Sequence, residues 1–230
     1  MYSRLVRLLG LILVALPPTP SAADTLPLLP DGAASAWHAV GRVNAGGHRQ
    51  RGMCSGVLVA PDRVLTAAHC LFRADGRPVP LDDLHFAAGW NRGRVVASSP
   101  VAAVEIHPKA IQDTTLDPAR DLALLRLSTP LTVTPLPLLG RDLAEPPYAI
   151  VAYQRSRPHA LSARFDCDLR LQKFTLALTS CAVEKGASGG PLLVQVDEVW
   201  HVAGVVSARG DGWTLVPRAL DWVAQTLADP

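Results

Sequence analysis

The chain has 230 residues, of which 49% are apolar and 18% are charged, so it can bury a sizeable core and is not a wholly disordered protein. Its formal net charge is +2, and residues 1–23 contribute two arginines and no acidic residue, so the remainder is neutral. This balance gives no indication of a nucleic-acid partner or of an anionic-membrane surface.

Residues 1–23 have the pattern of a secretory signal peptide. Arg4 and Arg7 precede an apolar run at 8–16, a proline break follows, and small residues lead to a cleavage site near Ala23. The apolar run of nine residues is far shorter than the roughly 20 that cross a bilayer, so no stable membrane anchor is expected. The pattern predicts a protein that is secreted or periplasmic.

Residues 24–36 are rich in Pro, Ala and Gly and have no periodicity, which predicts a flexible leader or a short propeptide. The folded domain is expected to start near Trp37 and to extend to residue 230. The proline-rich stretch 131–147 is the expected crossover between two halves, about 37–131 and 147–230, because prolines disfavour central strands.

Short runs rich in Val, Leu and Thr alternate with turn signals along the domain, which favours an all-β sandwich or barrel. These runs lie at 38–43, 55–60, 63–68, 94–106, 122–127, 148–153, 191–196 and 198–207. The segment 219–229 differs, because Leu220, Val223 and Leu227 follow the i, i+3, i+7 spacing of a helix. We expect a short amphipathic helix there.

The four cysteines form two pairs that are close in the sequence, and export would permit disulfides. Of the three possible connectivities we favour Cys54 with Cys70 and Cys167 with Cys181, each worth about 3 kcal/mol if unstrained. A metal site is not expected, because the sequence contains neither C-x-x-C nor H-E-x-x-H.

Two segments carry the residue types of nucleophilic catalysis. In CSGVLVAPDRVLTAAHCL, residues 54–71, His69 stands where a second strand is expected to end. In KGASGGPLL, residues 185–193, glycines flank Ser188 and permit a tight backbone that exposes its hydroxyl. The same backbone can direct the N–H groups of Gly186 and Ser188 at a developing oxyanion. A serine also needs a base to take its proton and a carboxylate to orient that base.

Both segments resemble the trypsin/chymotrypsin family of serine proteases, through T-A-A-H-C with its upstream C-S-G and through G-x-S-G-G-P. The resemblance covers about residues 37–227. It implies two packed six-stranded antiparallel barrels with a C-terminal helix and a substrate cleft between the barrels. It also implies a catalytic triad of His69, Asp121 and Ser188, in the family's chain order. Asp121 opens DLALLRL, similar to the family's D-I-A-L-L-x-L, and Asp117 is the alternative acid.

The resemblance also implies a substrate pocket, and here the chain departs from the family. Ser207 is similar to a family serine that supports the catalytic aspartate, whereas Ala182 stands where trypsin-like enzymes carry a pocket-floor aspartate. Arg209 either selects acidic side chains or points to solvent. Ala187 replaces the aspartate that precedes the family's nucleophile and pairs with a new N-terminal amine, so the oxyanion hole must be held in another way.

The expected function is that of a secreted serine endopeptidase, a monomer that acts on protein or peptide substrates through an acyl-enzyme and uses no cofactor. A catalytically silent homologue that serves as a secreted binding module is the alternative, because a collapsed oxyanion hole would leave the triad idle. An α/β-hydrolase esterase is disfavoured, since it needs an acid and then a histidine after the serine, and only His201 follows Ser188.

Overall fold

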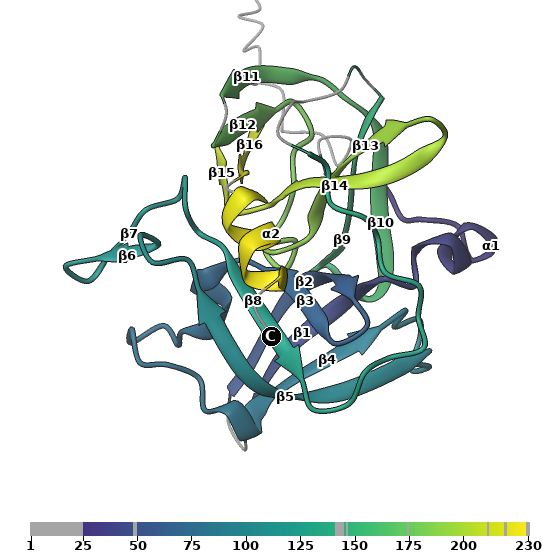
Figure 1. Ribbon diagram of the computed structural model, residues 1–230. Coiled ribbons are helices and arrows are strands. Elements are labelled where there is room, and N and C mark those ends of the chain that lie inside the picture. Colours follow the sequence, from purple (N-terminus) through teal and green to yellow (C-terminus); the bar gives the residue numbers. More distant parts are fainter. Residues whose placement is uncertain are drawn as a thin grey trace, which may run out of the picture.

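The computed structural model describes residues 25–47, 50–140, 145, 147–173, 175–210, 212–218 and 220–228. Two packed β units make up most of this chain (Figure 1). The segment expected to be a signal peptide lies outside the described residues. None of the described helices is long and apolar enough to cross a membrane.

The first unit is a closed antiparallel barrel of six strands in the order β1-β2-β3-β8-β5-β4. Its strands are β1 (Val40–Gly47), β2 (Gln50–Ala60), β3 (Arg63–Thr66), β4 (Leu84–Ala88), β5 (Ala97–Ile106) and β8 (Ala123–Leu127). Alternating apolar residues point inward, so that Leu58, Phe86 and Leu125 are fully buried. A small hairpin of β6 (Ile111–Gln112) and β7 (Thr115–Leu116) projects from this unit (Figure 1).

The second unit contains two four-stranded sheets, β10-β9-β13-β14 and β11-β12-β16-β15. The strands are β9 (Tyr148–Gln154), β10 (Arg157–Cys167), β11 (Leu169–Lys173), β12 (Leu176–Thr179), β13 (Pro191–Val196), β14 (Val199–Val205), β15 (Ala208–Gly210) and β16 (Trp213–Pro217). Only Asp168 separates β10 from β11, and only Val206 and Ser207 separate β14 from β15. Counted as two bent strands, these pairs link the sheets into a second six-stranded barrel and confirm the expected double-barrel fold.

Two short helices precede β1, two more connect β3 to β4, and a longer one ends the described chain. The short ones are α1 (Asp31–Ala34), η2 (Ser35–Trp37), η3 (Ala68–Leu71) and η4 (Leu81–Asp83). The expected C-terminal helix is confirmed as α2 (Leu220–Ala228), whose Leu220 and Val223 are buried. The ring centroids of Trp222 in α2 and of His107 in the first unit are 5.2 Å apart, so this helix contacts the first unit.

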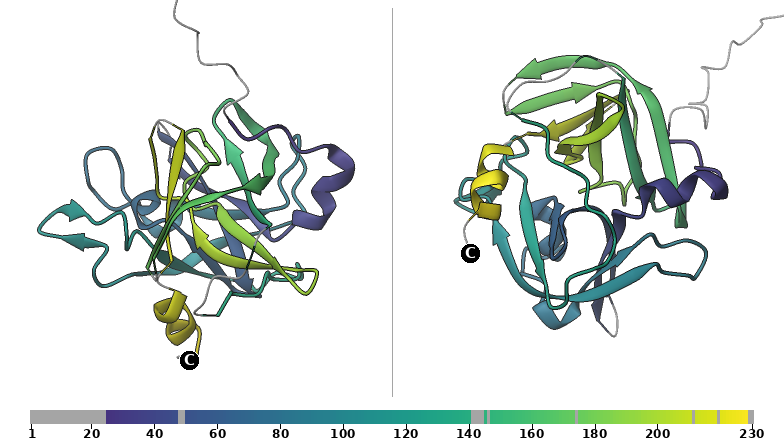
Figure 2. Two further views of the ribbon diagram at one scale, coloured as in Figure 1. Left: turned by 90° about the horizontal axis from the view of Figure 1, so that it is seen from above. Right: turned by 45° about the vertical axis from the view of Figure 1, so that its right-hand side comes forward.

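The beginning of the described chain differs from the flexible leader expected over residues 24–36. Residues 25–29, which we call the N-terminal strap, run beside β10 (Figure 2) and form backbone hydrogen bonds from Leu29 N to Leu161 O and from Ala163 N to Pro27 O, both 2.9 Å. Leu26 is fully buried, and Leu29 is 6% exposed. The apolar side chains of this segment therefore pack in the core of the second unit, which corrects the expected flexibility.

The crossover between the units is described up to residue 140. Leu136 N donates to Leu58 O of β2, and Leu139 N donates to Val202 O of β14. The chain therefore leaves the first barrel and joins the second within the proline-rich stretch, part of which lies outside the described residues.

Candidate active site

Strand register places His69 beside Asp121. Thr66, at the end of β3, pairs with Ala123 at the start of the antiparallel strand β8. Residues that follow Thr66 therefore lie next to residues that precede Ala123. The backbone N–H of His69 donates to Oδ1 of Asp121 at 2.8 Å, and Nδ1 of its ring lies 2.6 Å from Oδ2.

The carboxylate of Asp121 is fully buried and accepts a further hydrogen bond from the second unit. The hydroxyl of Ser207, at the bend between β14 and β15, donates to Oδ2 at 2.6 Å. An ionised carboxylate can only accept, so Nδ1 of His69 is the donor in their contact. The neutral imidazole then carries no proton on Nε2, which can act as a base.

Asp117, the alternative acid, makes different contacts. Its Oδ2 accepts from Arg120 at 2.7 Å, and its Oδ1 accepts from Ala119 N at 2.9 Å. Burial raises the pKa of Asp117, but the N–H of Ala119 and the Arg120 guanidinium outweigh it and lower the pKa below its usual range. This carboxylate is therefore engaged in the loop that leads to Asp121.

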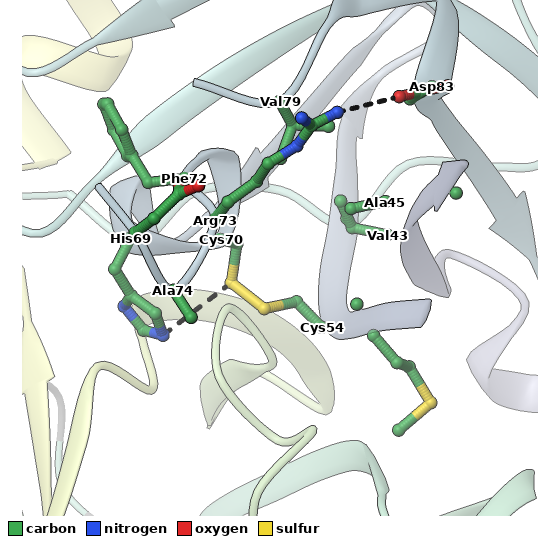
Figure 3. Close-up of a pocket in the computed structure, with 14 residues that line it drawn as sticks. Val43, Ala45, Cys54, His69, Cys70, Phe72, Arg73, Ala74, Val79 and Asp83 are labelled. Atoms are coloured by element: carbon green, nitrogen blue, oxygen red, sulfur yellow. Dashed lines mark hydrogen bonds and ion pairs between the residues drawn. A yellow bond between two sulfur atoms is a disulfide. The ribbon is translucent and has the colours of Figure 1, made fainter. Parts of the chain in front are cut away.

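Both expected disulfides are confirmed, Cys54 with Cys70 and Cys167 with Cys181. The first one joins β2 to η3 next to His69, and Figure 3 shows Nε2 of the ring facing Cys70, 3.9 Å from its sulfur. Cys54, His69 and Cys70 gather like metal ligands. Because the disulfide uses both sulfurs, neither is available as a thiolate ligand.

Ser188 lies in residues 184–188, which we call the serine loop, and its side chain is half-buried. Its carbonyl accepts from Ser55 N at 2.8 Å, which holds the loop on β2. A Cβ at Gly189 would lie 2.1 Å from Oγ1 of Thr66, so glycine permits the close approach to the end of β3. Within the described part of the chain, no hydrogen bond joins Nε2 of His69 to Oγ of Ser188.

The backbone N–H groups of Gly186 and Ser188, the expected oxyanion donors, take no part in the described backbone hydrogen bonds. Arg155 N donates to Lys185 O at 2.7 Å. Because a trans peptide points its C=O and N–H in opposite directions, the N–H of Gly186 faces away from Arg155. Gly186 has φ +97°, a conformation that glycine adopts without strain.

The expected pocket residues Ala182 and Arg209 are linked through Thr214. The hydroxyl of Thr214 donates to the carbonyl of Cys181 at 2.6 Å, and Ala182 follows Cys181 in the chain. Thr214 also pairs with Arg209 in the β15–β16 hairpin. The side chain of Arg209 is exposed, and no ion pair joins it to the described residues.

A cavity of about 630 Å³ lies beside His69, on the side of the Cys54–Cys70 disulfide (Figure 3). Its apolar lining includes Val43, Met53, Phe72 and Val79. Arg73 and Asp83 also line it and form an ion pair of 3.3 Å. The cavity therefore offers an apolar surface with a neutralised charge pair next to the proposed base.

Three residues that hold the serine loop were not singled out from the sequence: Ser55, Gln154 and Arg155. The buried hydroxyl of Ser55 donates to Gly186 O and accepts from Tyr153 N, both at 2.9 Å. Its place in C-S-G is the one signal that pointed to it. Gln154 and Arg155 stand in no motif, and only tertiary contacts reveal them.

Comparison with known proteins also relates this chain to serine peptidases. A family model described as "Trypsin-like peptidase domain" matches residues 54–205. The chain is 27% identical over 210 residues to mouse (Mus musculus) kallikrein 1-related peptidase b1, across 76% of this chain and 80% of that protein. It is also 27% identical over 216 residues to human (Homo sapiens) chymotrypsin-like elastase family member 3A, across 76% of this chain and 78% of that protein. Because the family model spans more than half of the chain, this protein belongs to the trypsin-like peptidase family of serine proteases.

Proposed function

We propose that this protein is a secreted serine endopeptidase with His69, Asp121 and Ser188 as its catalytic triad. The observation that carries the proposal is the buried carboxylate of Asp121, which holds both the backbone N–H and Nδ1 of His69. This arrangement fixes the ring and its tautomer and stabilises the imidazolium that forms during acyl transfer. The two disulfides support export to an oxidising compartment, outside the cell or in a periplasm.

The proposed reaction is acyl transfer. Nε2 of His69 takes the proton of Ser188 as Oγ attacks the scissile carbonyl carbon, and the N–H groups of Gly186 and Ser188 receive the oxyanion. The imidazolium then gives its proton to the leaving amine as the C–N bond breaks. Water attacks the acyl-enzyme, His69 takes its proton, and this proton returns to Oγ as the acid leaves. Substrate binding must close the His69–Ser188 contact, which is open here.

The substrate is a protein or peptide chain that lies in the cleft between the two units. The apolar cavity beside His69 is suited to side chains on the leaving-amine side of the scissile bond. On the other side, Ala182, Ser207 and Arg209 line the proposed specificity pocket. Because Ala182 offers no carboxylate at the floor, Arg or Lys has no charge partner there.

The test uses purified protein of residues 24–230 and its Ser188→Ala variant. Each is incubated with a mixed peptide library, and cleavage sites are identified by mass spectrometry. Cuts that require Ser188 are expected, together with stoichiometric labelling of Ser188 by a fluorophosphonate. The same cleavage sites report the preference of the pocket. N-terminal sequencing of the exported protein tests removal of residues 1–23.

A catalytically silent binding module is the second candidate. Ala187 favours it, because the methyl group cannot form the ion pair that shapes the hole in trypsin-type enzymes, and the open His69–Ser188 contact is compatible with it. Folded protein that neither cuts peptides nor reacts with the fluorophosphonate would support this function instead.

A further inference from the structure

The first residues of the serine loop are held by the end of β9. Glu184 N donates to Oε1 of Gln154 at 3.2 Å, and Arg155 N donates to Lys185 O at 2.7 Å. Ala187 is fully buried, and its methyl group can form no ion pair or hydrogen bond. Contacts from β9 and β2 therefore fix this loop where the side chain at 187 does not.

Gln154 uses both ends of its amide. Its side chain is fully buried, its Oε1 receives Glu184 N, and its Nε2 donates to Leu26 O at 3.0 Å. A buried amide with both ends bonded has one favourable orientation, because the flipped amide would face donor to donor and acceptor to acceptor. The carbonyl of Leu26 therefore determines that Oε1 points at the serine loop.

The carbonyl of Leu26 is itself held firmly in place. The side chain of Leu26 is fully buried, and the same carbonyl accepts a second hydrogen bond, from Nη2 of Arg157. The N-terminal strap continues along β10, with the hydrogen bonds of Pro27 O and Leu29 N on either side of Leu28. The strap thus presents a fixed acceptor to Gln154.

We propose that the N-terminal strap positions the serine loop through Gln154, so that this chain forms its oxyanion hole without a free α-amine. This inference rests on the proposed endopeptidase function. Leu26 orients the amide of Gln154, and Gln154 holds the N–H of Glu184. Gln154 is a positioning residue, because its side chain contacts the loop backbone and acts through Gly186 and Ser188.

The link from Leu26 through Gln154 to Glu184 is made of neutral amide groups in the core. Its strength does not depend on the charge of an amine or of a carboxylate. Proteolytic release of a particular N-terminal residue is therefore unnecessary for competence. Forms with additional residues before Thr25 and forms without them should have the same oxyanion hole.

The first experiment compares Gln154→Met with Gln195→Met in the protein of residues 24–230. Among the described hydrogen bonds, the side chain of Gln195 donates to the carbonyl of Glu198, in the turn between β13 and β14. This variant therefore makes the same chemical change at the end of β13 that is farther from the serine loop. For Gln154→Met we expect kcat to fall about 10- to 100-fold with a smaller change in KM. Misplaced oxyanion donors stabilise the transition state less, whereas they affect substrate binding little. Hydrogen exchange of peptides that cover 182–190 should become faster in Gln154→Met and stay unchanged in Gln195→Met.

A second experiment leaves the fold of the wild-type protein intact. The α-amine of a form that begins at Asp24 is acetylated, and activity is expected to remain within about twofold of the unmodified form, since no ion pair is lost. Loss of activity on acetylation would overturn the inference. So would a Gln154→Met variant with wild-type kcat and wild-type exchange at 182–190. If the wild-type protein itself neither cuts nor labels, the proposed function fails, whereas the exchange measurement still decides whether Gln154 positions the loop.

Discussion

The hydroxyl of Ser207 donates a 2.6 Å hydrogen bond to Oδ2 of Asp121, and this bond joins the two units at a fully buried carboxylate. The bend between β14 and β15 places Ser207 there. The neighbouring Val206 uses its N–H and C=O to bond Gly190 O and Gly189 N, beside the serine loop. One bend in the second unit therefore contacts both the proposed acid and the two glycines that follow the proposed nucleophile.

Ser207→Ala should weaken both stability and activity. A hydrogen bond to a charged group contributes about 1.5–3 kcal/mol, so the free energy of unfolding should fall by about that amount. We also expect a lower kcat, because Asp121 loses one of the contacts that orient it. Urea unfolding and peptide hydrolysis check this, with Ser98→Ala, at an exposed position of β5, as the control. Equal effects of the two variants would contradict the prediction.

Asp121→Asn and Asp117→Asn should separate the two candidate acids. At Asp121 the amide permits the wrong tautomer of His69, and kcat should fall about 10⁴-fold. Asp117 bonds Arg120 and Ala119 instead, so its variant should keep kcat within about tenfold of the wild type. Steady-state kinetics on one peptide substrate give both values. A larger loss at Asp117 would transfer the role to that residue.

Removal of either disulfide should lower the free energy of unfolding by a similar amount. The two removals should change different kinetic constants. The two bonds span 16 and 14 residues, so each double alanine variant should lose about 3 kcal/mol of unfolding free energy. Loss of Cys54–Cys70 frees the segment next to His69 and should lower kcat. Loss of Cys167–Cys181 frees the segment before Ala182 and should act on KM and cleavage preference. Identical kinetic changes in the two variants would show that neither disulfide has a local role.

His107 should make the stability of the protein fall in acid, because its imidazole is partly buried and its pKa is lowered. Burial, followed by the charges of Arg120 and Lys109, lowers the pKa of this imidazole, and Asp117 opposes the shift only in part. Nδ1 of His107 accepts the N–H of Lys109 at 3.1 Å, which requires the unprotonated nitrogen. The unfolded chain therefore binds more protons below its pKa of about 6.5. This contribution to stability is present above that pH and is lost as the pH falls through the lower pKa of the folded state.

His107→Gln should flatten this dependence. Urea midpoints between pH 5 and pH 8, measured in the Ser188→Ala background to prevent self-digestion, give the slope. Parallel profiles for the variant and its parent would mean that other groups cause the acid sensitivity.

Ala187→Asp should destabilise the protein. The fully buried methyl group would become a carboxylate, and a buried charge without an ion-pair partner costs about 3 kcal/mol or more. Ala182→Asp is the matched control at a half-buried position. It should change stability less and should raise kcat/KM for substrates with Arg or Lys before the scissile bond. Thermal unfolding and cleavage profiles check both, and a stable, more active Ala187→Asp protein would contradict the role given to the N-terminal strap.

The sequence predicted those features whose signals are local. Short apolar runs at 55–60 and 122–127 identified β2 and β8, helical spacing identified α2, and proximity along the chain paired the cysteines. The strands outside all the runs predicted from the sequence are β4, β6, β7, β10, β11, β12, β15 and β16. β10 contains Arg157, Pro158 and Asp166, and β12 pairs with β16 about 40 residues away, so their pairing partners stabilise them more than their own composition does.

By itself, the sequence predicted the double-barrel fold and the three proposed triad residues through its resemblance to the trypsin/chymotrypsin family. The motifs that carry the resemblance are local signals, because the tight turn at Ser188 requires glycines at particular positions. The sequence also marked Ala187 as a departure from the family. Only the tertiary structure decided how the serine loop is held. Leu26, Gln154 and Glu184 are separated by 128 and 30 positions, and no local pattern connects them. Buried polar groups cannot bond to water, so they form hydrogen bonds with other protein groups. Which groups are available depends on the tertiary fold and not on the local sequence.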